Sequence, residues 1–188
     1  MTNTAVKLDG AQIERIIIAD PKDMEKNQFY QELLSGKFAA MVSEAAEGKQ
    51  IAGSQEVYNI MKPLISQTDD IEQGWFIFLN TKNRIIAIEK LFSGTLTHSL
   101  ISPRQIIKKA LELKAACIIM VHNHPSGEPE PSDEDKKITS QLYMALKSCE
   151  ISLHDHMIIG TANRYYSFAD SGRIQACKDQ YDRYIADI

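Results

Sequence analysis

Apolar positions along the chain change from helical spacing to strand spacing, and this change divides the sequence. Up to about residue 47, apolar side chains recur every three or four positions, as at Phe29 and Leu33, which predicts two helices around a turn. The polar stretch at 48–55 reads as a junction. We therefore predict an N-terminal helical extension over residues 1–50.

Residues 51–172 are expected to form the main domain, because strand-length apolar runs alternate there with helical spacing. The run CIIMVH at 117–122 has no polar alternation, which is typical of a central strand covered on both faces. The short polar segment TKN predicts a hairpin between the first two strands. The predicted strands cover residues 74–81, 83–92, 117–122, 151–160 and 164–170, and the predicted helices cover 54–65, 102–116 and 138–149.

This alternation predicts an α/β (α+β) fold in which helices pack against a mixed β-sheet. A chain of 188 residues, 44% of them hydrophobic, is long enough for one well-buried core. Residues 173–188 form a C-terminal tail with weak helical spacing, which could dock on the domain or fray.

Charge and composition exclude some classes of partner. The net charge of −4 gives no overall attraction to a phosphate backbone, so nucleic-acid binding would need a local basic face. No apolar run reaches the length of about 18 residues that a membrane helix needs, and the amino terminus lacks a secretory pattern. The three cysteines form no CxxC pair. We expect a cytoplasmic protein without a membrane partner.

The segment VHNHPSGEPEPSDED carries the candidate chemistry. Side chains alternate along a strand, so His122 and His124 point the same way and can offer two imidazoles to one ion, while Asn123 points to the opposite face. If Ser132 caps the helix that follows, Asp135 falls at the third helical position and faces back toward the strand end. The segment thus predicts a His, His, Asp metal site.

Two histidines and one carboxylate leave a tetrahedral zinc ion with an open position for water, which is the catalytic pattern. Glu89 is the candidate general base, because a carboxylate interrupts the apolar row of its predicted strand and a nearby zinc-bound water would compensate its burial. If this strand lies at an edge or bulges, Glu89 instead faces solvent beside Lys90.

Each half of the motif also has a purely structural interpretation. An HxH pair alone can be surface or hydrogen-bonded histidines, and Ser132 with Asp135 can be a plain capping pair. A second pair, His154 and His156, also shares a predicted strand face, but no SxxD carboxylate follows it, and we expect His154 to be exposed. The conjunction of HxHP with a downstream SxxD, between a strand and a helix, is much rarer than either half.

HNHPSGEPEPSDED resembles the JAMM metalloprotease signature of the MPN/JAB domain, and in particular its RadC-like branch. The resemblance extends from Ile51 to Asp170 and implies a cytidine-deaminase-like mixed sheet with helices packed on it. It implies zinc ligands at His122, His124 and Asp135. The implied reaction is hydrolysis of a peptide or isopeptide bond through a zinc-activated water, with Glu89 shuttling the proton to the leaving amine and Ser132 stabilising the oxyanion. Asp155 and His156 match the DH of the family and are expected to support the site from behind.

Two other functions stay open. The chain could be a binding or scaffold module without proteolysis, or a RadC-like protein of DNA repair or of a mobile element. RadC-like proteins often carry an amino-terminal helix-hairpin-helix segment, and residues 1–50 show no glycine-rich hairpin of that kind. The implied partner is an unidentified protein or peptide substrate, and the oligomeric state stays open.

Overall fold

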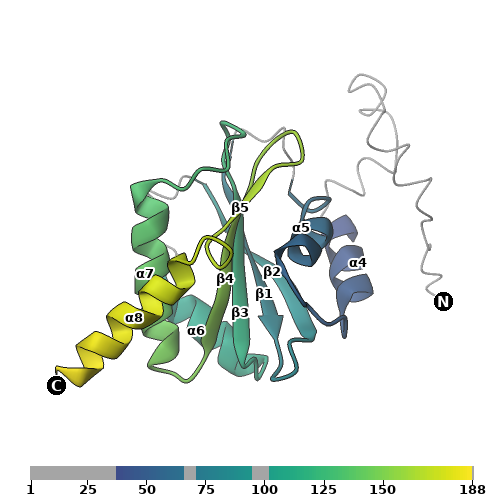
Figure 1. Cartoon of the computed structure of the whole chain (residues 1–188). Coiled ribbons are helices and arrows are strands. Elements are labelled where there is room, and N and C mark those ends of the chain that lie inside the picture. The colour runs from purple at the N-terminus through teal and green to yellow at the C-terminus, as the bar shows by residue number, and fades with distance from the viewer. Residues whose placement is uncertain (1–36, 66–70, 95–101, 188) are drawn as a thin grey trace, which may run out of the picture. The chain divides into compact units, whose positions relative to one another are not determined.

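The computed structural model describes residues 37–65, 71–94 and 102–187 (Figure 1). Most of the predicted N-terminal extension lies outside the described residues; within it, α4 spans Lys37–Ala46. The chain divides into two compact units, Met1–Met41 and Val42–Ile188, and the second unit carries the sheet and the candidate site. No helix in the described ranges is long and apolar enough to cross a membrane.

A mixed five-stranded sheet forms the centre of this unit. Its order is β2-β1-β3-β4-β5, with β3 parallel to β4 and the other neighbours antiparallel. The central position of β3 and its complete burial confirm the interpretation of CIIMVH as an interior strand. The strands are β1 (Gln73–Leu79), β2 (Ile85–Ser93), β3 (Cys117–Asn123), β4 (Ser152–Ile159) and β5 (Tyr165–Ser167).

Helices cover both faces of the sheet, with α6, α7 and α8 on one side and α5 on the other (Figure 1). The first face buries Phe76 and Phe78 of β1 with Met120 of β3, beneath Ile106 of α6 and Leu142 of α7. The parallel pair β3 and β4 needs a crossover, and α7 supplies it. The helices are α5 (Ser54–Met61), α6 (Pro103–Glu112), α7 (Asp133–Lys147) and α8 (Arg173–Ala186).

The predicted α/β fold with a mixed sheet is confirmed, and so is the hairpin between β1 and β2. Its turn is closed by Asn80, whose side chain accepts hydrogen bonds from the backbone N–H groups of Lys82 and Arg84 at 2.8 and 3.1 Å. The tail is a full helix rather than a weak one. Because α8 packs on α7 and buries Cys177, tertiary contacts compensate for its modest helical pattern.

Candidate metal centre

The two histidines of the motif sit at the end of β3, on the face that α7 covers. His122 is fully buried, and its Nε2 lies 3.0 Å from Nε2 of His124, which follows the last residue of the strand. Asn123 points to the opposite face, where its Oδ1 accepts a hydrogen bond from the backbone N–H of Gln73 at 2.8 Å. The predicted alternation is therefore observed, and both imidazoles converge on one point.

Asp135 reaches the same point from the start of α7, through a capping box. Ser132 is the N-cap: its Oγ accepts from the backbone N–H of Asp135 at 3.1 Å, and its own N–H donates to Asp135 Oδ2 at 2.8 Å. The Ser132 hydroxyl also donates to Oδ2, at 2.6 Å. The third helical position thus points back toward the strand end, and the Asp135 side chain has no exposed surface.

The three side chains form a group whose ligand atoms lie within 4.8 Å of one another. Nε2 of His122 lies 3.2 Å from Asp135 Oδ1, and Nε2 of His124 lies 3.2 Å from Oδ2. Ligands about 2.0–2.1 Å from a tetrahedral zinc ion lie about 3.3 Å apart, so these separations fit one ion.

One atom of this group strengthens the case for a cation. Asp135 Oδ1 is buried and, within the described part of the chain, accepts no hydrogen bond, although His122 Nε2 is near it. A buried carboxylate oxygen without a donor is costly, and a bound cation removes that cost. The residues present therefore fit a zinc ion.

The side chains of the group shift one another's pKa values. Burial alone would raise the pKa of Asp135, but the facing imidazoles of His122 and His124 and the Ser132 hydroxyl outweigh burial and hold that pKa well below its usual range. Burial would likewise lower the pKa of His124, but its hydrogen bonds to Asp135 and to the Glu128 carbonyl raise it. A carboxylate that stays ionised at neutral pH is what a metal ligand requires.

The loop between the two halves fixes the orientation of His124. Nδ1 of His124 lies 2.8 Å from the carbonyl oxygen of Glu128. A carbonyl only accepts, so Nδ1 carries a proton, and in the neutral form that binds a metal the lone pair of the ring is on Nε2, which faces the cluster. The Glu128 side chain is in turn held by Arg164, which donates to both carboxylate oxygens at 2.8 and 2.9 Å.

Glu89 lies on the same face of the sheet as the histidines, because Phe76 pairs with Glu89 on one side and with Met120 on the other. Its carboxylate, however, is 2.7 Å from Nζ of Lys109, and both side chains are 30% exposed. Lys109 of α6 compensates the partial burial of Glu89. The carboxylate is outside the three-residue group. Its role as a general base stays a prediction.

Two further residues lie directly behind the cluster. His156 of β4 is fully buried, with its Nε2 2.8 Å from Nδ1 of His122. Thr139 was not identified from the sequence, although it stands one helical turn after Asp135; its Oγ1 lies 2.6 Å from Nδ1 of His156. The i, i+4 spacing from a ligand on the same helix face is the signal that could have found it.

His154 does not join the site. It is half-buried rather than exposed, and its Nε2 lies 2.9 Å from Asn83 Oδ1 in the β1–β2 turn. The pairing of β3 with β4 shifts here, since Ile118 pairs with Leu153 and Ile119 with Asp155. His154 is the extra residue of this bulge, so the alternation predicted for the second histidine pair is broken.

Comparison with known proteins agrees with this architecture. The RadC-like JAB domain family matches residues 51–173. A UPF0758 protein of Chlorobaculum parvum is 44% identical over 122 residues, which is 65% of this chain and 54% of the relative. A UPF0758 protein of Janthinobacterium sp. is 48% identical over 98 residues, or 52% of this chain and 43% of the relative.

A third relative, a UPF0758 protein of Flavobacterium johnsoniae, is 38% identical over 124 residues, or 66% of this chain and 53% of the relative. The chain thus spans about half the length of the curated relatives it matches. The family match covers the strand, the loop and the helix start that deliver the three candidate ligands. The chain belongs to the RadC-like JAB domain family.

Proposed function

We propose that this protein is a zinc-dependent hydrolase of the JAMM type, which cleaves a peptide or isopeptide bond, with His122, His124 and Asp135 as the metal ligands. The observation that supports it most is a group of three converging ligand side chains, one of which has a buried carboxylate oxygen that accepts no hydrogen bond from the described residues. Three protein ligands rather than four is the pattern of catalytic zinc sites.

A zinc ion bound there would supply a Lewis acid and lower the pKa of a bound water to about 7. The chain provides the rest of the site. His122 and Asp135 are completely buried, whereas the His124 side chain is 13% exposed, so a substrate reaches the cluster from the side of His124. Burial of the other two ligands keeps bulk water away from the back of the site.

Glu89 is proposed to accept a proton from the attacking water and to deliver it to the leaving amine. Its strand carries it on the correct face, and its negative charge is stabilised by Lys109 at 2.7 Å. Because this ion pair is partly exposed, opening it costs little, on the order of 1 kcal/mol or less. Substrate binding can therefore exchange the Lys109 contact for contact with the reacting groups.

Ser132 is proposed to stabilise the oxyanion through its hydroxyl. The same hydroxyl now donates to Asp135 Oδ2, so its proton must turn toward the substrate during the reaction. The helix cap does not depend on that proton, because Ser132 Oγ still accepts from the N–H of Asp135 and Ser132 N–H still donates to Oδ2. One residue can thus serve as both cap and oxyanion donor.

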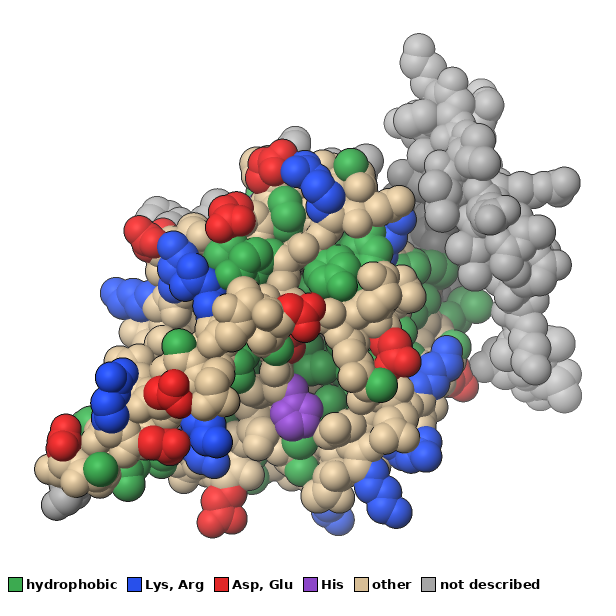
Figure 2. Space-filling view, in the orientation of Figure 1, with side chains coloured by type: hydrophobic (Ala, Val, Ile, Leu, Met, Phe, Trp, Pro, Cys, Tyr) green, Lys and Arg blue, Asp and Glu red, His purple; other side chains and the backbone are tan. Residues whose placement is uncertain are grey.

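The proposed substrate is a protein or peptide rather than a nucleic acid. On the face of the described domain that Figure 2 shows, acidic and basic side chains are interspersed and form no continuous basic surface. The net charge of −4 points the same way. A cytoplasmic location is part of the proposal and is supported by three cysteines that form no disulfide.

A cleavage assay tests this function. The zinc-loaded protein is incubated with a mixed peptide library and with lysine peptides carrying an isopeptide bond, and products are read by mass spectrometry. We expect cleavage that stops on zinc removal and slows by about 10²–10⁴-fold in Glu89→Gln, since that variant loses the general base. Glu112→Gln, an exposed glutamate of α6, is the matched control. Cleavage that neither zinc removal nor Glu89→Gln slows would contradict the proposal.

A further inference from the structure

The ring of His156 is held rigidly behind the cluster. Phe168 stacks on one side of it, with ring centroids 4.7 Å apart and planes inclined by 20°. His122 lies on another side, with centroids 4.9 Å apart. Phe168 and His156 are both almost entirely buried. The imidazole therefore has one orientation, and its two nitrogens face Thr139 and His122.

The direction of each hydrogen bond follows from the hydroxyl of Thr139. Its Oγ1 lies 2.6 Å from the backbone carbonyl oxygen of Asp135, which can only accept, so the single hydroxyl proton is donated there. Toward Nδ1 of His156, also 2.6 Å away, Thr139 can only accept. Nδ1 of His156 must therefore carry its proton.

The proton on Nδ1 of His156 in turn determines the tautomer of His122. The His156 ring is completely buried against Phe168, and its two nitrogens face the Thr139 hydroxyl and the His122 imidazole rather than a carboxylate. Because a charge there would be buried without a counter-ion in contact, the ring is neutral. With the proton on Nδ1, Nε2 of His156 has a free lone pair and accepts from Nδ1 of His122 at 2.8 Å. A metal ligand has to be a neutral imidazole, so with the proton on Nδ1 the lone pair of His122 lies on Nε2, which faces the cluster.

We propose that Thr139 and His156 form a positioning relay that fixes His122 in the tautomer with a free Nε2 lone pair, and so raises the zinc affinity of the site. His124 reaches the same tautomer separately, through the carbonyl of Glu128. Both histidines then present lone pairs to one point. The relay rests on the proposed zinc site but not on the hydrolytic reaction.

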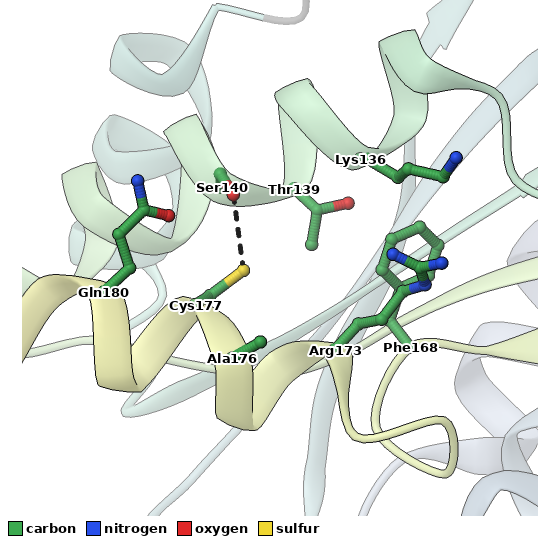
Figure 3. A pocket seen from close by; sticks show the side chains of 8 residues that line it. All are labelled: Lys136, Thr139, Ser140, Phe168, Arg173, Ala176, Cys177 and Gln180. Atoms are coloured by element: carbon green, nitrogen blue, oxygen red, sulfur yellow. Dashed lines mark hydrogen bonds between the residues drawn. The ribbon is translucent and has the colours of Figure 1, made fainter.

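The position of Thr139 separates the relay from the substrate side of the site. Thr139 projects from α7 into the wall of a pocket of about 130 Å³ between α7 and α8, together with Phe168 and Arg173 (Figure 3). Ser140, the next residue of α7, lies in the same wall, with its hydroxyl 3.5 Å from Cys177 Sγ. Thr139 and Ser140 are adjacent hydroxyl residues, and only Thr139 contacts His156, so they form a matched pair for substitution.

The experiment measures zinc affinity by competition with a chelator. Thr139→Val keeps the shape of the side chain but removes the hydroxyl, and we expect about a 10–100-fold loss of affinity. Thr139→Ser keeps the hydroxyl and should bind within about threefold of the wild type, and Ser140→Ala should be unchanged. Equal affinity of Thr139→Val and the wild type would overturn the relay.

A second readout needs no metal. In the zinc-free protein above neutral pH, nitrogen NMR of His122 should show the proton on Nδ1, and Thr139→Val should give a mixture of tautomers. Should Thr139→Val fail to fold, His156→Phe, which keeps a ring in the same place but offers no acceptor to His122, takes its place in both measurements. A wild type that binds no zinc but shows the fixed tautomer would refute the proposed zinc site and the effect of the relay on zinc affinity, and would leave only the hydrogen-bond order of the relay. An unchanged tautomer in the variants would overturn the relay itself.

Discussion

Two histidine pairs of identical spacing lie on neighbouring parallel strands, yet only one of them forms a candidate metal site. His122 lies near the end of β3, whose pairing with β1 is regular, and His124 directly follows the strand, next to the start of α7. His154 and His156 lie on β4, where a bulge at His154 interrupts the alternation. Of this pair, only His156 faces the cluster, and it contacts His122.

The difference shows what the spacing HxH can and cannot specify. In the sequence, both pairs have the two-residue spacing that places side chains on one face of a regular strand. A site forms only where the backbone keeps that period and a second element supplies a carboxylate, as α7 does with Asp135. Of the second pair, His156 supports His122 and His154 contacts Asn83 instead, so substitutions in the two regions should have very different effects.

The largest effect is expected at Asp135. Asp135→Asn removes the charge that faces the two imidazoles, and zinc affinity should fall by at least about 10³-fold, because an amide is a poor ligand for zinc. Isothermal titration with zinc measures this directly. Asp133→Asn is the matched control in the same helical turn, because its carboxylate is exposed and pairs with Lys136. Equal zinc affinity in wild type and Asp135→Asn would break the comparison.

An intermediate effect is expected at Asp155, between the two histidines of the second pair. Burial raises its pKa to about 6, despite hydrogen bonds from Ser167, Ala169 and the N–H of His156. The folded-state pKa lies above the unfolded value of about 3.9, so the native state binds the extra proton between about pH 4 and pH 6. Its stabilising contribution is present below about pH 4 and is lost as pH rises through 6.

Asp155→Asn should remove that loss, because Asn keeps an acceptor for the two N–H groups and the Ser167 hydroxyl can turn to accept from the new amide. The free energy of unfolding of the variant, relative to wild type, should rise by about 2–3 kcal/mol from pH 4 to pH 7. Denaturant unfolding at several pH values measures the difference, with Asp179→Asn on α8 as an exposed control. A difference that stays constant with pH would show that Asp155 does not titrate in this window.

The smallest effect is expected at His154. His154→Ala removes one half-buried hydrogen bond to Asn83, which is worth about 1 kcal/mol of unfolding free energy. Zinc affinity should not change, because the bulge keeps this side chain out of the cluster. Isothermal titration with zinc, as for Asp135→Asn, measures the zinc affinity of His154→Ala. A loss of zinc affinity beyond about threefold would mean that the second pair is closer to the site than the structure places it.

The sequence predicts the parts of the site that local geometry determines. Strand alternation places His122 and His124 together, and helix capping turns Asp135 back toward them, so neither depends on distant residues. The ion pair of Glu89 with Lys109 joins a strand to a helix that no local pattern relates. The bulge at His154 arises only when β3 and β4 pair, and the contact of Thr139 with His156 arises only when α7 packs on β4.

The central claim is that His122, His124 and Asp135 hold one zinc ion. The most direct measurement is anomalous diffraction at the zinc absorption edge, from crystals of the full chain grown with zinc. The account predicts one peak, about 2.0–2.2 Å from Nε2 of His122, Nε2 of His124 and an oxygen of Asp135. An intact fold with no peak there, or with zinc bound only elsewhere, would contradict it.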